Sequence, residues 1–264
     1  MHASTTAAGA VLAVIAALPA VSAHGYVASV ISGGTTYAGA SPQWFYSSTK
    51  PTQAGWFAYN QDNGFVAPSE YGDNNITCHK GATPGNTYVP VTAGSTISLV
   101  WNTWPDSHHG PVINQMAKCS GECTSVDKTT LKFFAVQNTG LINDASPPGT
   151  WATDNLIANK FTGTLKIPAG LAAGNYVLRH EIIALHSAGN ADGAQSYPNC
   201  INLKVTGSGT ETPCASGADC RAGTALYKST DPGILISIYS AISSYTMPGP
   251  AVWSGLKKRA AWSA

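Results

Sequence analysis

The sequence is poor in charge. Only 10% of its 264 residues are Asp, Glu, Lys or Arg, and 14 basic side chains nearly cancel 13 acidic ones, which leaves a formal net charge of +1. Proteins that bind nucleic acids or anionic membranes do so through clustered basic side chains. We therefore expect neither a nucleic-acid nor a membrane partner.

Long apolar runs are scarce as well. The apolar stretch at residues 9–23 is shorter than the roughly 20 residues that cross a bilayer, and it ends in Val21-Ser22-Ala23. Small residues at this spacing are typical of a signal-peptidase site. We expect residues 1–23 to be a secretory signal that is removed, so that the mature chain is extracellular and begins at His24.

Helical periodicity is nearly absent, because no such pattern exceeds about ten residues and only residues 154–159 suggest a short helix. The chain instead contains 27 Gly, 16 Pro, 7 Trp, 11 Tyr and 6 Phe. Short β-type runs bounded by turn residues recur, and they predict an all-β antiparallel sandwich with long loops. These runs are residues 26–31, 96–103, 131–138, 163–168, 175–186, 200–207 and 233–239.

We expect one domain at residues 24–250 and a short, flexible tail at 251–264, since no linker leads to a second module. Residues 34–75 and 139–160 are long and irregular. Loops of this length in a compact domain are usually functional surfaces.

The six cysteines indicate disulfides, because an even number in an exported chain is typical of a disulfide framework. Spacing alone leaves all 15 pairings open. Cys119 and Cys123 suggest a local bridge, as do Cys214 and Cys220, which would leave Cys78 for Cys200. The C-x3-C and C-x5-C spacings match zinc sites poorly. Asn75-Ile76-Thr77 is a sequon for N-glycosylation, which we expect on an exposed loop.

His24 gains a special property if the signal is removed, because its α-amine and its ring Nδ1 can then chelate one metal ion. The ordinary pKa of an α-amine is only about 7.7–8.0, so deprotonation near neutral pH costs little. A third nitrogen from another histidine would complete a planar set that suits Cu(II). His108 and His109, beside the Gly110-Pro111 turn, are the candidates for that nitrogen.

Gln195 and Tyr197 lie two residues apart, so on an extended segment they share one face. A phenol on that face would approach a metal axially, and the amide would hold a small bound ligand. His186 precedes this segment and is placed to act beside the metal ligands. His180 lies six residues earlier, about 20 Å away along a strand, so we expect a structural role for it.

The chain resembles the fungal lytic polysaccharide monooxygenases of auxiliary activity family nine, formerly glycoside hydrolase family sixty-one. The resemblance extends through Pro250. The motifs that carry it are HGYV, WPDSHHGPVINQMAKCSGECTSVDKTTLKF, PPGTWATDNLIAN, NYVLRHEIIALHSAGNADGAQSYPNC, DPGILISIY and YTMPGP.

This resemblance implies an immunoglobulin- or fibronectin-III-like β-sandwich with one copper ion on a flat face. It implies His24 and His108 as copper ligands, Tyr197 as the axial ligand, and His186 and Gln195 as catalytic groups beside them. Position 109 is variable in the family. The resemblance also supports the bridges Cys78–Cys200 and Cys119–Cys123, whereas the bridge between Cys214 and Cys220 rests on proximity alone.

The implied reaction is oxidative cleavage of β-1,4-glucan, cellulose above all, at C1 or C4. It uses O2 or H2O2 and an external one-electron reductant, and we expect a monomer. Tyr245 matches a tyrosine on the family's flat face, and Trp44, Tyr46 and Trp56 are further candidates for stacking on glucose rings.

Two alternatives from other classes remain open. A glycoside hydrolase would use two of the 13 acidic residues and would release unmodified sugar ends without copper or reductant. A secreted copper- or glucan-binding protein without turnover would release no oxidised oligosaccharides. A blue-copper site is disfavoured because no Cys/His/Met set stands out.

Overall fold

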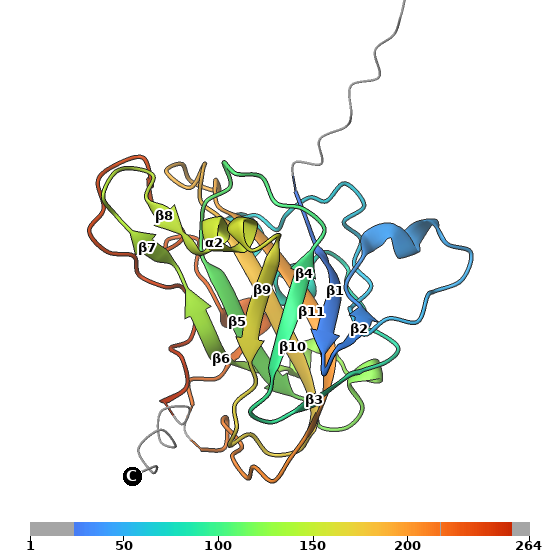
Figure 1. Ribbon diagram of the computed structural model, residues 1–264. Helices are drawn as coiled ribbons and strands as arrows, with labels where there is room; N and C mark the ends of the chain where they lie inside the picture. The colour runs from blue at the N-terminus through green and yellow to red at the C-terminus, as the bar shows by residue number, and fades with distance from the viewer. Residues whose placement is uncertain (1–23, 217, 255–264) are drawn as a thin grey trace, which may run out of the picture.

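Two β-sheets stack face to face in the computed structural model, which describes residues 24–216 and 218–254 (Figure 1). The expected signal segment and most of the expected tail lie outside these residues. Among the described residues, no helix is long and apolar enough to span a membrane.

The smaller sheet has four antiparallel strands in the order β2-β1-β4-β9. Buried apolar residues alternate clearly at Ile97, Leu99 and Trp101, as expected for a strand with one face against a core. The strands are β1 (Val27–Ser32), β2 (Thr35–Ala38), β4 (Thr96–Trp101) and β9 (Thr162–Lys166).

The larger sheet has six strands in the order β12-β6-β5-β10-β11-β3. Its pairs are antiparallel except for the parallel pair β11–β3. The strands are β3 (Val89–Thr92), β5 (Val112–Lys118), β6 (Lys132–Thr139), β10 (Gly174–Ala184), β11 (Gln195–Thr206) and β12 (Arg221–Ala222).

Short elements occupy the connections. A two-stranded ribbon joins β7 (Leu141–Asn143) to β8 (Thr150–Trp151), and α2 (Ala152–Ala158) follows it directly. The remaining elements are α1 (Asn75–Cys78), η1 (Pro42–Tyr46), η2 (Pro68–Glu70), η3 (Cys123–Ser125), η4 (Lys128–Thr130) and η5 (Gly223–Ala225).

Six of the seven predicted strands are present, but the seventh, at residues 233–239, is wrong. This segment forms turns in which Ile234 and Ile238 are buried while Leu235 and Tyr239 are exposed. The burial alternates as in a strand, but turns at residues 232–234 and 238–239 interrupt the backbone, and among the described residues this segment pairs with no strand. The predicted helix is confirmed as α2, which begins slightly earlier than expected.

Strand β5 was missed because its centre is polar. Asn114 and Gln115 are buried there, and each pairs with a polar side chain of the neighbouring β10. Asn114 Oδ1 lies 2.7 Å from His180 Nδ1, and Gln115 Oε1 accepts from Arg179 at 3.3 Å. Apolar alternation therefore does not mark this strand.

The six-stranded sheet is buried on both faces. Its inner face packs on the four-stranded sheet through one apolar cluster, and loops cover its outer face with a second cluster. On β10, His180 points inward, and the indole of Trp101 on β4 donates to its Nε2 at 2.9 Å. This bond joins the two sheets.

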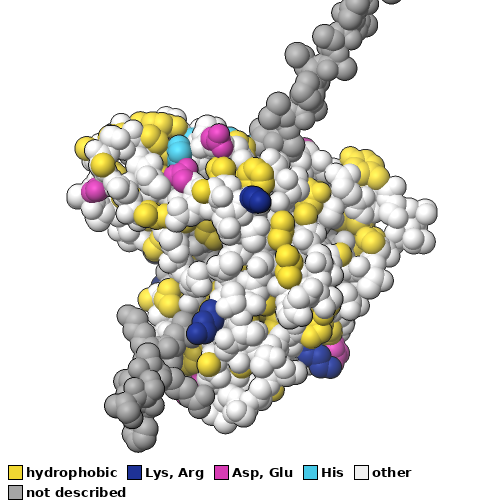
Figure 2. Space-filling view, viewed as in Figure 1, with side chains coloured by type: hydrophobic (Ala, Val, Ile, Leu, Met, Phe, Trp, Pro, Cys, Tyr) yellow, Lys and Arg dark blue, Asp and Glu magenta, His cyan; other side chains and the backbone are white. Residues whose placement is uncertain are grey.

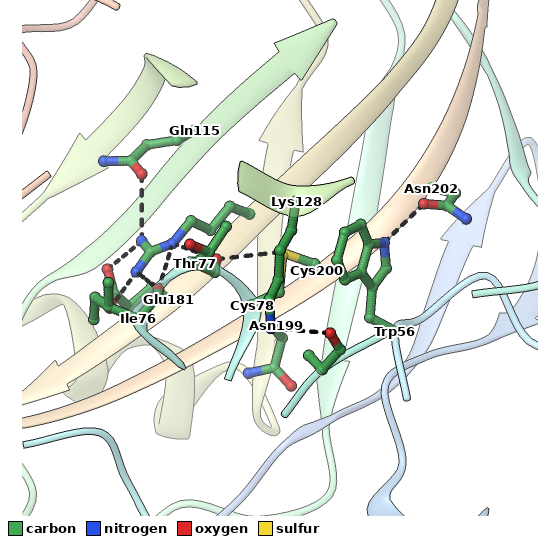
Figure 3. Close-up of a disulfide and its surroundings, with 12 residues drawn as sticks. Trp56, Ile76, Thr77, Cys78, Gln115, Lys128, Glu181, Asn199, Cys200 and Asn202 are labelled. Atoms are coloured by element: carbon green, nitrogen blue, oxygen red, sulfur yellow. Dashed lines mark hydrogen bonds and ion pairs between the residues drawn. A yellow bond between two sulfur atoms is a disulfide. The ribbon is translucent and has the colours of Figure 1, made fainter. Parts of the chain in front are cut away.

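Arg179 and Glu181 point to the opposite, outer face, where they form a fully buried ion pair. Figure 3 shows Glu181 beside Ile76 and Thr77, close to the Cys78–Cys200 disulfide. Arg179 also donates to the Ile76 and Thr77 carbonyls of α1 at 2.8 and 2.9 Å. The same helix carries Cys78, so the ion pair and the neighbouring disulfide hold α1 against the sheet.

Three disulfides are present. Cys78–Cys200 joins residues 122 apart, whereas Cys119–Cys123 and Cys214–Cys220 close short loops. None of the described cysteines is free.

Candidate metal centre

Three side chains predicted from distant segments meet at one end of the sandwich. His24 precedes β1, His108 lies in the loop between β4 and β5, and Tyr197 lies near the start of β11. The His24 ring centroid is 5.2 Å from that of His108 and 5.4 Å from that of Tyr197. From the side drawn in Figure 2, the visible histidines lie at the top of the molecule, beside acidic side chains.

His108 is held with one ring nitrogen unoccupied. Its Nδ1 lies 3.1 Å from the Ser107 hydroxyl, while its Nε2 is buried without a hydrogen-bond partner. Burial, followed by the neighbouring His186 and His24 rings, lowers the pKa of His108 to about 4. The ring is therefore neutral near pH 7, which is the form that binds metals.

His186 and Gln195 lie beside this group. The His186 ring is 3.9 Å from the His108 ring, and its Nδ1 is buried without a partner. The Tyr197 hydroxyl donates to Gln195 Oε1 at 2.8 Å. Burial raises the pKa of Tyr197, so its phenol stays protonated.

His109 is directed elsewhere. Its Nδ1 pairs with Asp154 Oδ1 of α2 at 2.9 Å. The same carboxylate accepts from the Trp151 amide, and the Gly110 amide donates to the Thr153 hydroxyl. These bonds fix the His108 loop to the first turn of α2.

The donor set contains only two imidazoles and one phenol, to which a free α-amine on His24 would be added. Accordingly, within residues 24–216 and 218–254, no three His, Cys, Asp or Glu side chains gather as a metal site. Burial lowers the pKa of His24, and the nearby Asp62 carboxylate opposes this shift.

His180 and Glu181 are buried and bonded within the sheet, as predicted for structural residues. The prediction that Trp56 stacks on a glucose ring is wrong, because Trp56 is only 1% exposed and its indole donates to Asn202 at 2.8 Å. A ring buried in this way cannot stack on a sugar.

The other aromatic candidates differ in exposure. Tyr46 is 70% exposed, whereas Trp44 is half-buried and donates to the Ala58 carbonyl at 3.0 Å. Tyr245 is half-buried, with its hydroxyl donating to the Gly233 carbonyl at 2.7 Å and its ring packed edge-on against Trp151. Sugar stacking by these three residues stays a prediction.

Asn75 lies in α1 rather than on an open loop. It is half-buried, its Oδ1 accepts from the Gly81 amide at 3.1 Å, and the sequon residue Thr77 is buried. Its glycosylation also stays a prediction.

Sequence reasoning missed Phe65, whose ring lies 6.4 Å from that of His24 and 6.1 Å from that of Tyr197. Phe65 belongs to the long irregular segment, which has no periodicity to show which side chain points inward. Only the length of that segment indicated that it contributes to a functional surface.

A family model described as Auxiliary Activity family 9 (formerly GH61) matches residues 24–246. The chain is 51% identical over 261 residues to a lytic polysaccharide monooxygenase A of Talaromyces verruculosus, and the match covers 98% of this chain and 78% of that protein.

Solved structures agree with this match. The extended catalytic domain of a lytic polysaccharide monooxygenase from H. jecorina has a TM-score of 0.82 and 48% identity, covering 88% of this chain and 92% of that one. A cellulose-active polysaccharide monooxygenase from M. thermophila has a TM-score of 0.75 and 32% identity, covering 87% and 98%.

Proposed function

Because the chain belongs to auxiliary activity family 9, the lytic polysaccharide monooxygenases, we propose that it is a secreted, copper-dependent enzyme that cleaves cellulose. The observation that carries the copper proposal is the buried, unpartnered Nε2 of His108, on a ring 5.2 Å from that of His24. Three disulfides support an extracellular location, where such bonds persist.

His24 would hold copper through its α-amine and its ring Nδ1, and His108 through Nε2. A nitrogen-rich set of this kind suits Cu(II). Tyr197 would interact with the metal only weakly, because a phenol kept protonated by burial is a poor anionic ligand. The neutral state of both imidazoles fits the metal, since neither must lose a proton near pH 7.

Copper supplies the one-electron chemistry by which O2 or H2O2 becomes an oxidant for a C–H bond at C1 or C4 of glucose. The chain contributes the surroundings of that step. Gln195 uses its Oε1 to fix the Tyr197 hydroxyl, so its amide nitrogen keeps a proton to donate toward a small bound molecule. His186, with a buried unpartnered Nδ1 beside His108, holds or gives up a proton there.

Cellulose is a neutral polymer, so the low net charge of the chain, +1, suits it as a substrate. The M. thermophila relative is described as cellulose-active. Tyr46 is the most exposed of the aromatic candidates and would stack on a glucose ring. An external reductant would supply the electrons, and the protein would act as a monomer.

Mass spectrometry of the soluble products tests this proposal. Copper-loaded chain beginning at His24, incubated with cellulose and ascorbate, should release aldonic or 4-keto oligosaccharides. His108→Ala, treated identically, should release none. Unmodified sugar ends that appear without ascorbate would show a hydrolase instead, and binding to cellulose without any product would show a binding protein.

A further inference from the structure

Trp104 packs against residues of the candidate metal centre, although it is not one of the proposed ligands. It lies in the loop between β4 and β5 and is only 2% exposed. Its indole N–H donates to the main-chain carbonyl of His108 at 2.9 Å. The indole thus closes the loop that presents His108.

The ring of Trp104 also packs against two members of the candidate site. Its centroid is 5.9 Å from that of His108 and 5.0 Å from that of Tyr197, and both contacts are nearly perpendicular, at 90° and 88°. His108 and Tyr197 come from segments far apart in the sequence. One buried side chain therefore touches both.

The His108 carbonyl would lose this partner without the indole N–H. A carbonyl that loses its partner in a buried setting tends to turn toward another donor or toward water. Such a turn would rotate the His108 main chain and move Nε2. Metal sites tolerate displacements of only about 0.5 Å in their ligands.

We propose that Trp104 is the positioning residue of the metal centre. Its N–H fixes the main chain of His108, and its ring sets the orientation of the His108 imidazole relative to the Tyr197 phenol. This inference rests on the proposed copper site and extends it to a residue behind the ligands.

Trp101 provides a matched control within the same core. It is also 2% exposed, its indole donates at 2.9 Å, and its ring lies 5.2 Å from that of Trp104. Its acceptor, however, is His180, which lies outside the candidate site. Trp101→Phe and Trp104→Phe remove the same atoms and one hydrogen bond each.

The experiment compares copper affinity and the Cu(II) EPR spectrum of the wild-type chain beginning at His24 and of the two variants. We expect Trp104→Phe to bind copper about tenfold more weakly, the equivalent of one ordinary hydrogen bond, and to change the EPR parameters. Trp101→Phe should lose comparable thermal stability yet keep the wild-type spectrum and an affinity within about twofold of wild type.

Wild-type affinity and spectrum in Trp104→Phe would overturn the proposal, and so would equal changes in both variants, which would indicate general loosening of the core. If Trp104→Phe does not fold, benzothienylalanine at position 104 keeps the ring shape and removes only the N–H, and the same tenfold loss is expected. A wild-type chain that binds no copper would instead refute the proposed function.

Discussion

At the scale of single residues, the candidate site depends on which nitrogen each histidine leaves unoccupied. His108 has a buried, unpartnered Nε2 on a ring close to that of His24, whereas the Nδ1 of His109 pairs with Asp154. Adjacent histidines on one loop thus have different environments. This difference favours His108 as the proposed ligand, while His109 anchors the loop to α2.

Substituting these two histidines separately tests the assignment. His108→Ala removes one of three nitrogen donors and should weaken Cu(II) binding by at least about 100-fold, or roughly 2.7 kcal/mol. His109→Ala should keep affinity within about tenfold, since only the anchor to α2 is lost. Isothermal titration with Cu(II) measures both affinities, and a reversal of the two results would contradict the assignment.

At the scale of the elements, β4, β5 and β10 meet at His180. Its Nε2 accepts from the Trp101 indole, so the proton of the neutral ring is on Nδ1 and is donated to Asn114. Protonation of Nε2 would break the bond between the sheets. Burial accordingly lowers the pKa of His180 to about 3.

Stability should therefore fall as the solution is acidified. Above pH 6.5, the ordinary pKa of histidine, His180 is neutral in both states and contributes no pH dependence. Between 6.5 and about 3, only the unfolded chain takes up the proton, so the free energy of unfolding should decrease by about 1.4 kcal/mol per pH unit from this group.

Urea unfolding of the metal-free protein from pH 7 to pH 4 measures this slope. The variant His180→Gln should lose the part of the slope that His180 supplies. Other buried histidines, such as His79 with a pKa lowered to about 4 by burial, should continue to contribute in both proteins. Identical slopes in both proteins would show that His180 titrates normally.

At the scale of the whole molecule, a disulfide and an ion pair hold the outer loops on the six-stranded sheet. Cys78–Cys200 ties α1 to β11 three residues beyond Tyr197, and Arg179 binds the same helix. Strand β11, which carries Tyr197 of the candidate site, is thus hydrogen-bonded to its neighbouring strands and cross-linked to the covering helix α1.

The disulfides should contribute according to the loops they close. Replacing Cys78 and Cys200 by Ser opens a loop with a separation of 122 residues and should cost about 5 kcal/mol of unfolding free energy. Replacing Cys119 and Cys123, only 4 apart, should cost about 2 kcal/mol. Denaturant titration gives both values, and a larger loss from the short bridge would contradict the loop argument.

Much of this molecule could be predicted from its sequence. Apolar alternation between turn residues located six strands, and local motifs located His24, His108 and Tyr197. Strand β5 was not predicted, because its central Asn114 and Gln115 are buried polar residues whose partners lie on β10. Residues 233–239 were wrongly predicted as a strand, because β-branched apolar side chains also occur in turns that pack on the apolar cluster of the sheet's outer face.

The contacts of Phe65 and Trp56 were beyond sequence reasoning for a related reason. Both lie in the long segment between β2 and β3, where the backbone follows neither a strand nor a helix for most of its length. Only tertiary packing decides that Phe65 meets His24 while Trp56 bonds to Asn202. Exposure of an aromatic ring in such a segment cannot be predicted from spacing.

The most direct test of the central claim measures the copper affinity of two chains that differ by a single residue. One begins at His24, and the other retains Ala23 so that the His24 nitrogen is an amide. The first should bind one Cu(II) per chain at least about 100-fold more tightly, because an amide nitrogen is a poor donor near pH 7, while both unfold at the same temperature without copper. Equal affinities would contradict the account.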